Sequence, residues 1–239
     1  MKITIIETGL PPAAIRADFP GYPDMFEKLI GGADPDLSFE TIALEHGDAF
    51  PDPASLEGIL ITGSAYGVYD NVPWMQTLME FIRWAAEARI PQAGLCFGHQ
   101  ALAQALGGHV AKSDKGWGIG RHSYSVPKKP EWMADAPDEI AFAVSHQDQV
   151  LTPPPGAEII ATNAFCTYAG LNYTHIPAMS FQGHPEFDDA FISALYKARE
   201  GNPLEPEAVS EAIESLKQPH HNPDAGRWLA SFFRTPVDR

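Results

Sequence analysis

Short apolar runs alternate with amphipathic segments along the first hundred residues. The runs at residues 2–6, 39–43 and 58–62 have the length and composition of strands that are buried on both faces of a parallel sheet. Between and after these runs, residues 23–30 and 74–88 place apolar side chains at helical spacing. The alternation predicts an α/β fold with a mostly parallel central sheet and helices on both faces.

The pattern changes in the middle of the chain. Short extended segments at residues 122–126, 140–144, 159–163 and 165–168 are separated by proline and glycine. We expect these segments to form antiparallel strands that flank the main sheet. Residues 188–199 then return to a helical pattern.

The last forty residues predict a helical tail. Residues 205–217 form an amphipathic helix candidate, and residues 225–233 carry Trp228 among other large apolar side chains. We expect these aromatic side chains to pack the tail onto the rest of the protein. The predicted division is therefore a main domain at residues 1–200 and a C-terminal helical extension at residues 201–239.

A cysteine set between glycines is the strongest candidate for chemistry. Cys96 follows a predicted strand, residues 90–94, and precedes a predicted helix, residues 98–106. Gly94 and Gly98 allow backbone to approach backbone at a sharp strand-to-helix turn, as in the nucleophile turns of other α/β enzymes. The first N–H groups of such a helix favour negative charge on sulfur. The alternative for this motif alone is a buried cysteine in an ordinary strand–helix junction.

A second polar cluster follows another short apolar strand, residues 178–182. Pro185 biases His184 toward extended backbone, so His184 and Glu186 are expected to project to the same side. A carboxylate in that position orients the imidazole and stabilises imidazolium. The alternative is an ordinary exposed turn, but the presence of Cys96 favours a nucleophile, a base and an orienting acid.

These residues resemble the triad, or class I, glutamine amidotransferases. Residues 94–100 read Gly-Leu-Cys-Phe-Gly-His-Gln, similar to that family's nucleophile turn, and residues 184–186 read His-Pro-Glu, similar to its base and acid. The order Cys, His, Glu also matches the family. The resemblance covers residues 1–200 and implies a flavodoxin-like three-layer sandwich, with Cys96, His184 and Glu186 as the catalytic residues.

The resemblance extends to two loops. Residues 58–64 are similar to the family's strand and glycine loop, whose backbone helps to form the oxyanion hole. This implies Phe97 as one N–H donor and Gly63 or Ser64 as the second, with Gly63 preferred. Residues 145–150 resemble the family's Ser-His-x-Asp loop, which lines the glutamine pocket. The implied substrate-binding residues are Ser64, Gln100, Ser145, His146 and Gln147.

One position departs from the common family pattern. Many members carry phenylalanine before the histidine, whereas Gly183 precedes His184 here. This arrangement resembles a stand-alone subgroup that includes γ-glutamyl peptidases.

Composition limits the classes of partner. The net charge is −15, from 16 basic and 31 acidic residues, which disfavours nucleic-acid binding. No apolar run is long enough to cross a membrane, and the amino terminus enters directly as a strand without a signal-peptide pattern. Of the two cysteines, Cys166 is expected in a core strand, so no disulfide framework is predicted. A cytoplasmic location is expected.

Other segments predict less chemistry. Residues 220–221 are two histidines without metal-like spacing, so a solvated loop between helices is expected and no metal site. Residues 116–120 are glycine-rich but lack the strand–helix context of a dinucleotide site. Asp70 and Trp74 either border the pocket or shape the entry to a helix. No cofactor is predicted.

The sequence therefore predicts an enzyme that hydrolyses a γ-glutamyl amide through a glutamyl-thioester. One version is a glutaminase that acts on L-glutamine and passes ammonia to a synthetase partner chain. A second is a stand-alone γ-glutamyl peptidase that acts on small γ-glutamyl compounds. A third, favoured least because the three catalytic residue types are present, is a binding module without catalysis.

Overall fold

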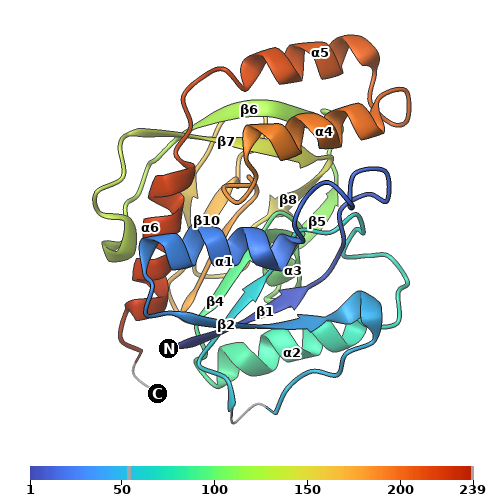
Figure 1. Cartoon of the computed structure of the whole chain (residues 1–239). Coiled ribbons are helices and arrows are strands. Elements are labelled where there is room, and N and C mark those ends of the chain that lie inside the picture. The colour runs from blue at the N-terminus through green and yellow to red at the C-terminus, as the bar shows by residue number, and fades with distance from the viewer. Residues whose placement is uncertain (53–54, 238–239) are drawn as a thin grey trace.

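A seven-stranded sheet forms the centre of the protein (Figure 1). The structure is a computed structural model that describes residues 1–52 and 55–237. The strands follow the order β2-β1-β3-β4-β11-β10-β9, in which the first five are parallel and β10 pairs antiparallel with both β11 and β9. Their bounds are β1 Lys2–Glu7, β2 Ser38–Ala43, β3 Gly58–Ile61, β4 Gln92–Leu95, β9 Ala157–Ala161, β10 Gly170–Tyr173 and β11 Ala178–Phe181.

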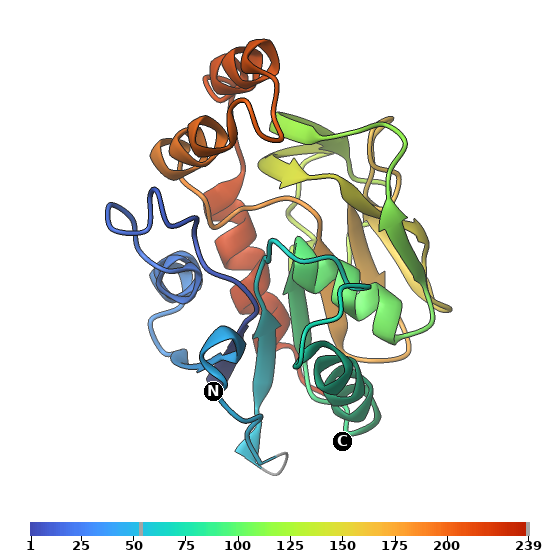
Figure 2. The ribbon, with the colours of Figure 1, turned by 90° about the vertical axis from the view of Figure 1, so that its right-hand side faces the viewer.

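Helices cover both faces of this sheet, as the alternating pattern predicts (Figure 2). One face carries α1 Tyr22–Ala33 and α6 Asn222–Arg234, and the other carries α2 Met75–Glu87 and α3 Phe97–Ala105. Successive strand residues point to opposite faces. Ile5 accordingly packs in the cluster with α1 and α6, whereas Ile6 packs with α2 and α3. The predicted α/β fold, a flavodoxin-like three-layer sandwich, is confirmed.

Two antiparallel strand pairs flank the main sheet. One of them corresponds to the segments predicted at residues 122–126 and 140–144, and the other was not predicted. The segment predicted at residues 159–163 overlaps β9, which lies at the edge of the main sheet and not beside it. The two flanking pairs are β5 His109–Lys112 with β8 Asp148–Thr152, and β6 Gly118–Ser125 with β7 Glu139–His146. Two further helices, α4 Asp189–Arg199 and α5 Pro206–Ser215, lie beside this second pair (Figure 1). Short 3₁₀ turns occur at Leu44–His46 and Glu131–Met133.

The strand predicted at residues 165–168 is wrong. This segment is a turn that precedes β10, and Cys166 is fully buried in it rather than in a strand. The cause is Asn163, whose side-chain oxygen accepts hydrogen bonds from the N–H groups of Phe165, at 3.0 Å, and Cys166, at 2.7 Å. A side chain that binds the backbone in this way competes with strand pairing.

The C-terminal helices pack on the rest of the protein. Trp228 of α6 is buried in the same cluster as Ile3 of β1, and its indole N–H donates to Asp135 at 2.7 Å. On α5, Ser215 accepts a hydrogen bond from the N–H of Arg121 in β6 at 2.9 Å. The division of the chain at residue 200 stays a prediction.

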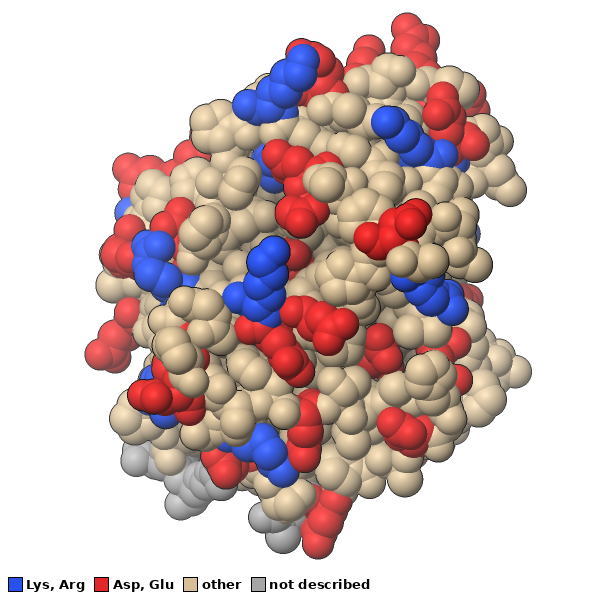
Figure 3. Space-filling model, in the orientation of Figure 1, with Lys and Arg blue, Asp and Glu red and all other residues tan. Residues whose placement is uncertain are grey.

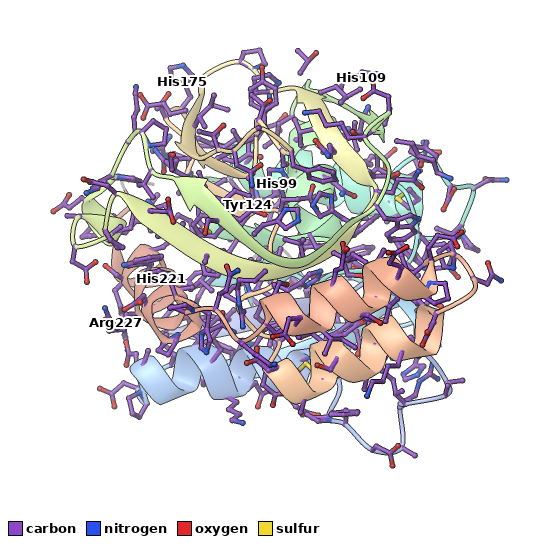
Figure 4. The ribbon with its side chains drawn as sticks, turned by 90° about the horizontal axis from the view of Figure 1, so that it is seen from above. His99, His109, Tyr124, His175, His221 and Arg227 are labelled. Carbon is purple, nitrogen blue, oxygen red and sulfur yellow. The ribbon has the colours of Figure 1, made fainter. Side chains whose placement is uncertain are left out.

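The expected solvated loop at residues 220–221 is only half correct. His220 is exposed, but His221 borders α6 and binds the backbone of β7 (Figure 4). Its Nδ1 accepts from the N–H of Ala141 and its N–H donates to the carbonyl of Ala141, both at 3.0 Å. The loop therefore joins the tail to the flanking strands.

The surface is acidic without a large basic region on the face in view. Figure 3 shows the Lys and Arg side chains of that face in small separate groups among more numerous acidic ones. Among the residues that the structure describes, no helix is long and apolar enough to span a bilayer.

Candidate active site

Cys96 lies at the turn between a strand and a helix. β4 ends at Leu95 and α3 begins at Phe97, so Cys96 is the single residue between them. Its φ of 52° and ψ of −103° lie outside the regions that most residues with a side chain adopt. The N–H of Cys96 donates to the carbonyl of Phe181 in β11 at 2.9 Å, which fixes this conformation against the neighbouring strand. Strain of this kind is concentrated at functional sites.

The glycines around Cys96 allow a close backbone approach, as the sequence predicts. A Cβ atom on Gly94 would overlap the carbonyl of Gly98, and one on Gly98 would overlap the carbonyl of Ile61 in β3. The N–H of Gly98 donates to the carbonyl of Thr62 at 3.1 Å. The first turn of α3 is thus held directly against the end of β3.

Strand pairing brings His184 to Cys96. β11 is parallel to β4, with Phe181 beside Leu95, so both chains leave the sheet at the same edge. The N–H of His184 then donates to the carbonyl of Ala143 in β7 at 2.9 Å, which directs the chain back across this edge. A segment far along the sequence is therefore placed beside the cysteine.

Cys96, His184 and Glu186 lie together at this end of the sheet. His184 Nδ1 lies 2.7 Å from Glu186 Oε1. The ring of Phe187 stacks on the imidazole with centroids 4.1 Å apart. Burial alone would lower the pKa of His184, but the negative charges of the nearby Cys96 and Glu186 side chains raise it to about 10. The predicted sharing of a face by His184 and Glu186 is confirmed.

Two backbone N–H groups close to Cys96 belong to Gly63 and to Phe97, the next residue in the chain. In the part of the chain that the structure describes, the N–H groups of Gly63 and Phe97 donate no hydrogen bond to another group. A Cβ atom on Gly63 would lie 3.0 Å from Cε1 of His184 and 3.8 Å from Cβ of Cys96. Gly63 is therefore in direct reach of both side chains, as the resemblance implies for an oxyanion donor.

A cavity of about 330 Å³ opens beside Cys96. Its size lies at the lower end of the range for small-molecule sites. Its lining brings together Cys96 and all five residues predicted to bind substrate: Ser64, Gln100, Ser145, His146 and Gln147.

The five residues differ in how much of their polar surface is already used. The amide nitrogen of Gln100 donates to the carbonyl of Asp148 at 2.9 Å, and the hydroxyl of Ser64 donates to the carbonyl of Thr8 at 2.6 Å. His146 Nδ1 also lies 3.0 Å from the carbonyl of Asp148. Burial lowers the pKa of His146 to about 3, so its imidazole is neutral at pH 7 and its Nε2 is an acceptor. Because these polar atoms of Gln100 and Ser64 already bind backbone carbonyls, the two side chains also help to fix the shape of the cavity.

Several residues of the cavity were not predicted from the sequence. Tyr69 donates from its hydroxyl to Asp148 Oδ2 at 2.7 Å, and Arg199 donates from Nη1 to Ser145 Oγ at 2.8 Å. Lys112 and Trp117 also line this cavity. These side chains come from separate loops, the end of a strand and the end of a helix, and no spacing in the sequence links them.

The structure decides between the two roles considered for Asp70 and Trp74. Asp70 lines the cavity, and its Oδ2 accepts from the N–H of Gly67 at 2.9 Å. Trp74 precedes α2 and packs edge-on against Phe97, with ring centroids 6.0 Å apart. Asp70 therefore borders the pocket, whereas Trp74 shapes the entry to the helix.

Gly183 has a packing reason to be glycine. A Cβ atom at this position would lie 2.8 Å from Cβ of Phe142 in β7. Phe142 is itself buried between the flanking strands and the main sheet. Where many family members have a phenylalanine before the histidine, this chain has Gly183, and Phe142 of β7 packs against that glycine.

Comparisons with curated proteins agree with this architecture. The chain is 26% identical over 240 residues to a glutamine amidotransferase-like protein of Schizosaccharomyces pombe, covering 95% of each chain. It is 28% identical over 181 residues to γ-glutamyl peptidase 4 of Arabidopsis thaliana, covering 72% of this chain and 70% of the peptidase. A match to the glutamine-hydrolysing GMP synthase of Thermomicrobium roseum, 32% identical over 139 residues, covers 55% of this chain but only 24% of the synthase.

A solved structure shares the fold over nearly the whole chain. The glutamine amidotransferase of Methylobacillus flagellatus superposes with a TM-score of 0.76 at 24% identity, over 97% of this chain and 92% of that one. The sequence model of the class I glutamine amidotransferase family matches residues 38–190, which include Cys96, His184 and Glu186. The chain therefore belongs to the class I glutamine amidotransferase family.

Proposed function

We propose that this protein hydrolyses γ-glutamyl amides through a Cys96–His184–Glu186 triad. His184 first takes the thiol proton of Cys96, and the thiolate then attacks the side-chain carbonyl carbon of the γ-glutamyl group. The N–H groups of Phe97 and Gly63 stabilise the oxyanion that forms. His184 then gives its proton to the departing nitrogen as the C–N bond breaks. Water, deprotonated by His184, attacks the glutamyl-thioester and releases glutamate, which returns the thiol.

One observation carries this proposal. The imidazole is bonded to Glu186 at 2.7 Å, Cys96 lies close enough to raise the pKa of His184, and Cys96 lines a cavity open to small molecules. A nucleophile, a base and an orienting acid in this order are the components of acyl transfer. Glu186 holds Nδ1, so Nε2 is the nitrogen that exchanges the proton with sulfur.

The substrate that we propose first is a small γ-glutamyl compound, either L-glutamine or a γ-glutamyl peptide. The similarity to γ-glutamyl peptidase 4 supports a peptide, as does Gly183 before the histidine. The similarity to part of GMP synthase supports the alternative, in which ammonia released from L-glutamine passes to a synthetase partner chain. The two versions share the same chemistry at Cys96 and differ in the leaving group.

The test is turnover by the purified protein alone, with L-glutamine and with γ-L-glutamylglycine. We expect release of glutamate from at least one of them, and loss of that release in Cys96→Ala. Cys166→Ala is the matched control, since Cys166 is buried in a turn outside the cavity and should leave turnover unchanged. Turnover that persists in Cys96→Ala, or its absence from the wild type with both compounds, would contradict the proposed function.

A further inference from the structure

The cavity beside Cys96 contains an arginine that no carboxylate neutralises. Arg199 is the last residue of α4 and lines the cavity together with Cys96. Three other arginines, Arg121, Arg227 and Arg234, each form an ion pair with an aspartate. In the described ranges 1–52 and 55–237, no Asp or Glu lies within 4.0 Å of the Arg199 guanidinium. Lys112, the other basic side chain of the lining, is exposed and also forms no ion pair in the described ranges. The cavity therefore carries positive charge that suits an anionic ligand.

The guanidinium of Arg199 is held in place by two neighbours. Its Nη1 donates to Ser145 Oγ at 2.8 Å, and its centre lies 5.8 Å from the centroid of the Trp117 ring. The hydrogen bond and the cation–π contact fix the plane of the group but engage only part of its donors. The remaining N–H groups form a planar fork that matches a carboxylate.

The cavity also contains two acidic side chains. Asp70 and Asp148 line it along with Arg199. The carboxylate of Asp148 accepts a hydrogen bond from the Tyr69 hydroxyl, a neutral donor. One cavity therefore offers both an arginine and carboxylates, the charges that complement a ligand with a carboxylate and an ammonium group.

We propose that Arg199 binds a carboxylate of the substrate and so determines which γ-glutamyl compounds are accepted. This inference rests on the proposed function for the identity of the substrate. The carboxylate has two sources: the α-carboxylate of the glutamyl group, or the carboxylate of an amino acid that leaves from the γ-amide. Arg199 acts on binding and not on the reacting bond, so it is a specificity-determining residue rather than a catalytic one.

A matched pair of substrates separates the two sources. γ-L-glutamylglycine and γ-L-glutamylglycinamide have nearly the same size, but only the first has a carboxylate on the leaving group. For Arg199→Gln we expect kcat/KM for γ-L-glutamylglycine to fall about 10- to 100-fold, mainly through KM, because a charge-assisted hydrogen bond is lost. A loss for that compound alone assigns the leaving-group carboxylate, and an equal loss for both compounds assigns the α-carboxylate.

Two further variants control this experiment. Lys197→Gln removes an exposed positive charge from the same last turn of α4, outside the cavity, and should leave both kcat/KM values unchanged. Arg199→Lys keeps the charge without the planar fork and should recover part of the loss. Unchanged kcat/KM for both substrates in a folded Arg199→Gln protein would overturn the inference.

Binding measurements distinguish this inference from the proposed function. Calorimetry with γ-L-glutamylglycine compares Cys96→Ala with the double variant Cys96→Ala/Arg199→Gln, and neither protein needs turnover. A dissociation constant raised about 10- to 100-fold in the double variant supports the inference even if the wild type hydrolyses nothing. Equal dissociation constants, or no binding by either protein, would overturn it.

Discussion

On one side of Cys96 lie His184 and Glu186, whose side chains are 5% and 1% exposed and bonded to each other. On the other side lies the cavity, where Tyr69 is 52% exposed and charged groups face solvent. The first side is packed against Phe187 and has one arrangement available to it. The second is open and lined by long side chains. From this difference we infer that the proposed catalytic groups are held in fixed positions, whereas the groups that would select the substrate are more exposed.

The two sides also come from different kinds of structure. The Cys96 turn and the His184 segment follow adjacent parallel strands, β4 and β11, so the sheet itself sets their separation. The cavity residues come from the loop after β3, the junction of β7 and β8, and the end of α4. Binding residues on loops can vary without disturbing the scaffold beneath them. We therefore expect substitutions on the buried side to lower kcat and substitutions on the cavity side to raise KM.

The largest effect is expected on the buried side. His184→Ala should lower kcat by about 10⁴-fold or more, because the triad residues act as a unit. For the same reason the double variant Cys96→Ala/His184→Ala should lose no more activity than either single variant. Steady-state kinetics on proteins with matched melting curves measures this. If the two losses of activity multiplied in the double variant, Cys96 and His184 would act independently, contrary to this prediction.

A smaller effect is expected on the open side. Tyr69→Phe removes only the hydroxyl that donates to Asp148 Oδ2 at 2.7 Å across the edge of the cavity. Because both groups are accessible to solvent, we expect KM to rise about 3- to 10-fold with kcat nearly unchanged. Combining this variant with Asp148→Asn tests the pair, since the two losses should not add. A fall in kcat without a change in KM would contradict a role for Tyr69 in substrate binding.

The last prediction concerns stability rather than turnover, in the layer beneath both sides. His99 in α3 is fully buried, with Nδ1 2.7 Å from Ser180 Oγ of β11, and burial lowers its pKa to about 3. Between pH 6.5 and about 3 the unfolded chain binds a proton at His99 that the folded protein does not. The free energy of unfolding should therefore decrease as the pH falls through this range.

His99→Gln should remove this contribution, about 1.4 kcal/mol per pH unit. Denaturant unfolding at several pH values measures the slope. His109→Gln is the control, because Figure 4 shows His109 at the edge of the molecule and His99 inside it. An identical slope in His99→Gln and the wild type would contradict the burial argument.

The same division explains what could be predicted from the sequence. The sheet, the turn at Cys96 and the shared face of His184 and Glu186 follow from apolar runs, glycine spacing and one proline, all local signals. The loop motifs also correctly predicted that Ser145 and His146 line the cavity. In contrast, residues 165–168 were wrongly predicted as a strand because an asparagine side chain outcompeted strand pairing.

Arg199 and Tyr69 could not be predicted. Arg199 ends a helix in which basic residues are ordinary, since they favour the negative end of the helix dipole. Tyr69 lies in a loop with no period. Their roles depend on contacts with Ser145 and Asp148, which only the folded chain brings near. The spacing of residues along the sequence does not predict such long-range contacts.

The most direct test of the central claim is to trap the acyl-enzyme. Wild-type protein is mixed with L-glutamine or γ-L-glutamylglycine, quenched in acid during turnover, digested and analysed by mass spectrometry. We predict that the peptide that contains Cys96 gains the mass of one glutamyl group. The Cys96→Ala protein and the peptide that contains Cys166 should show no such increase. Turnover with no adduct at Cys96, or an adduct at Cys166 instead, would contradict the proposed mechanism.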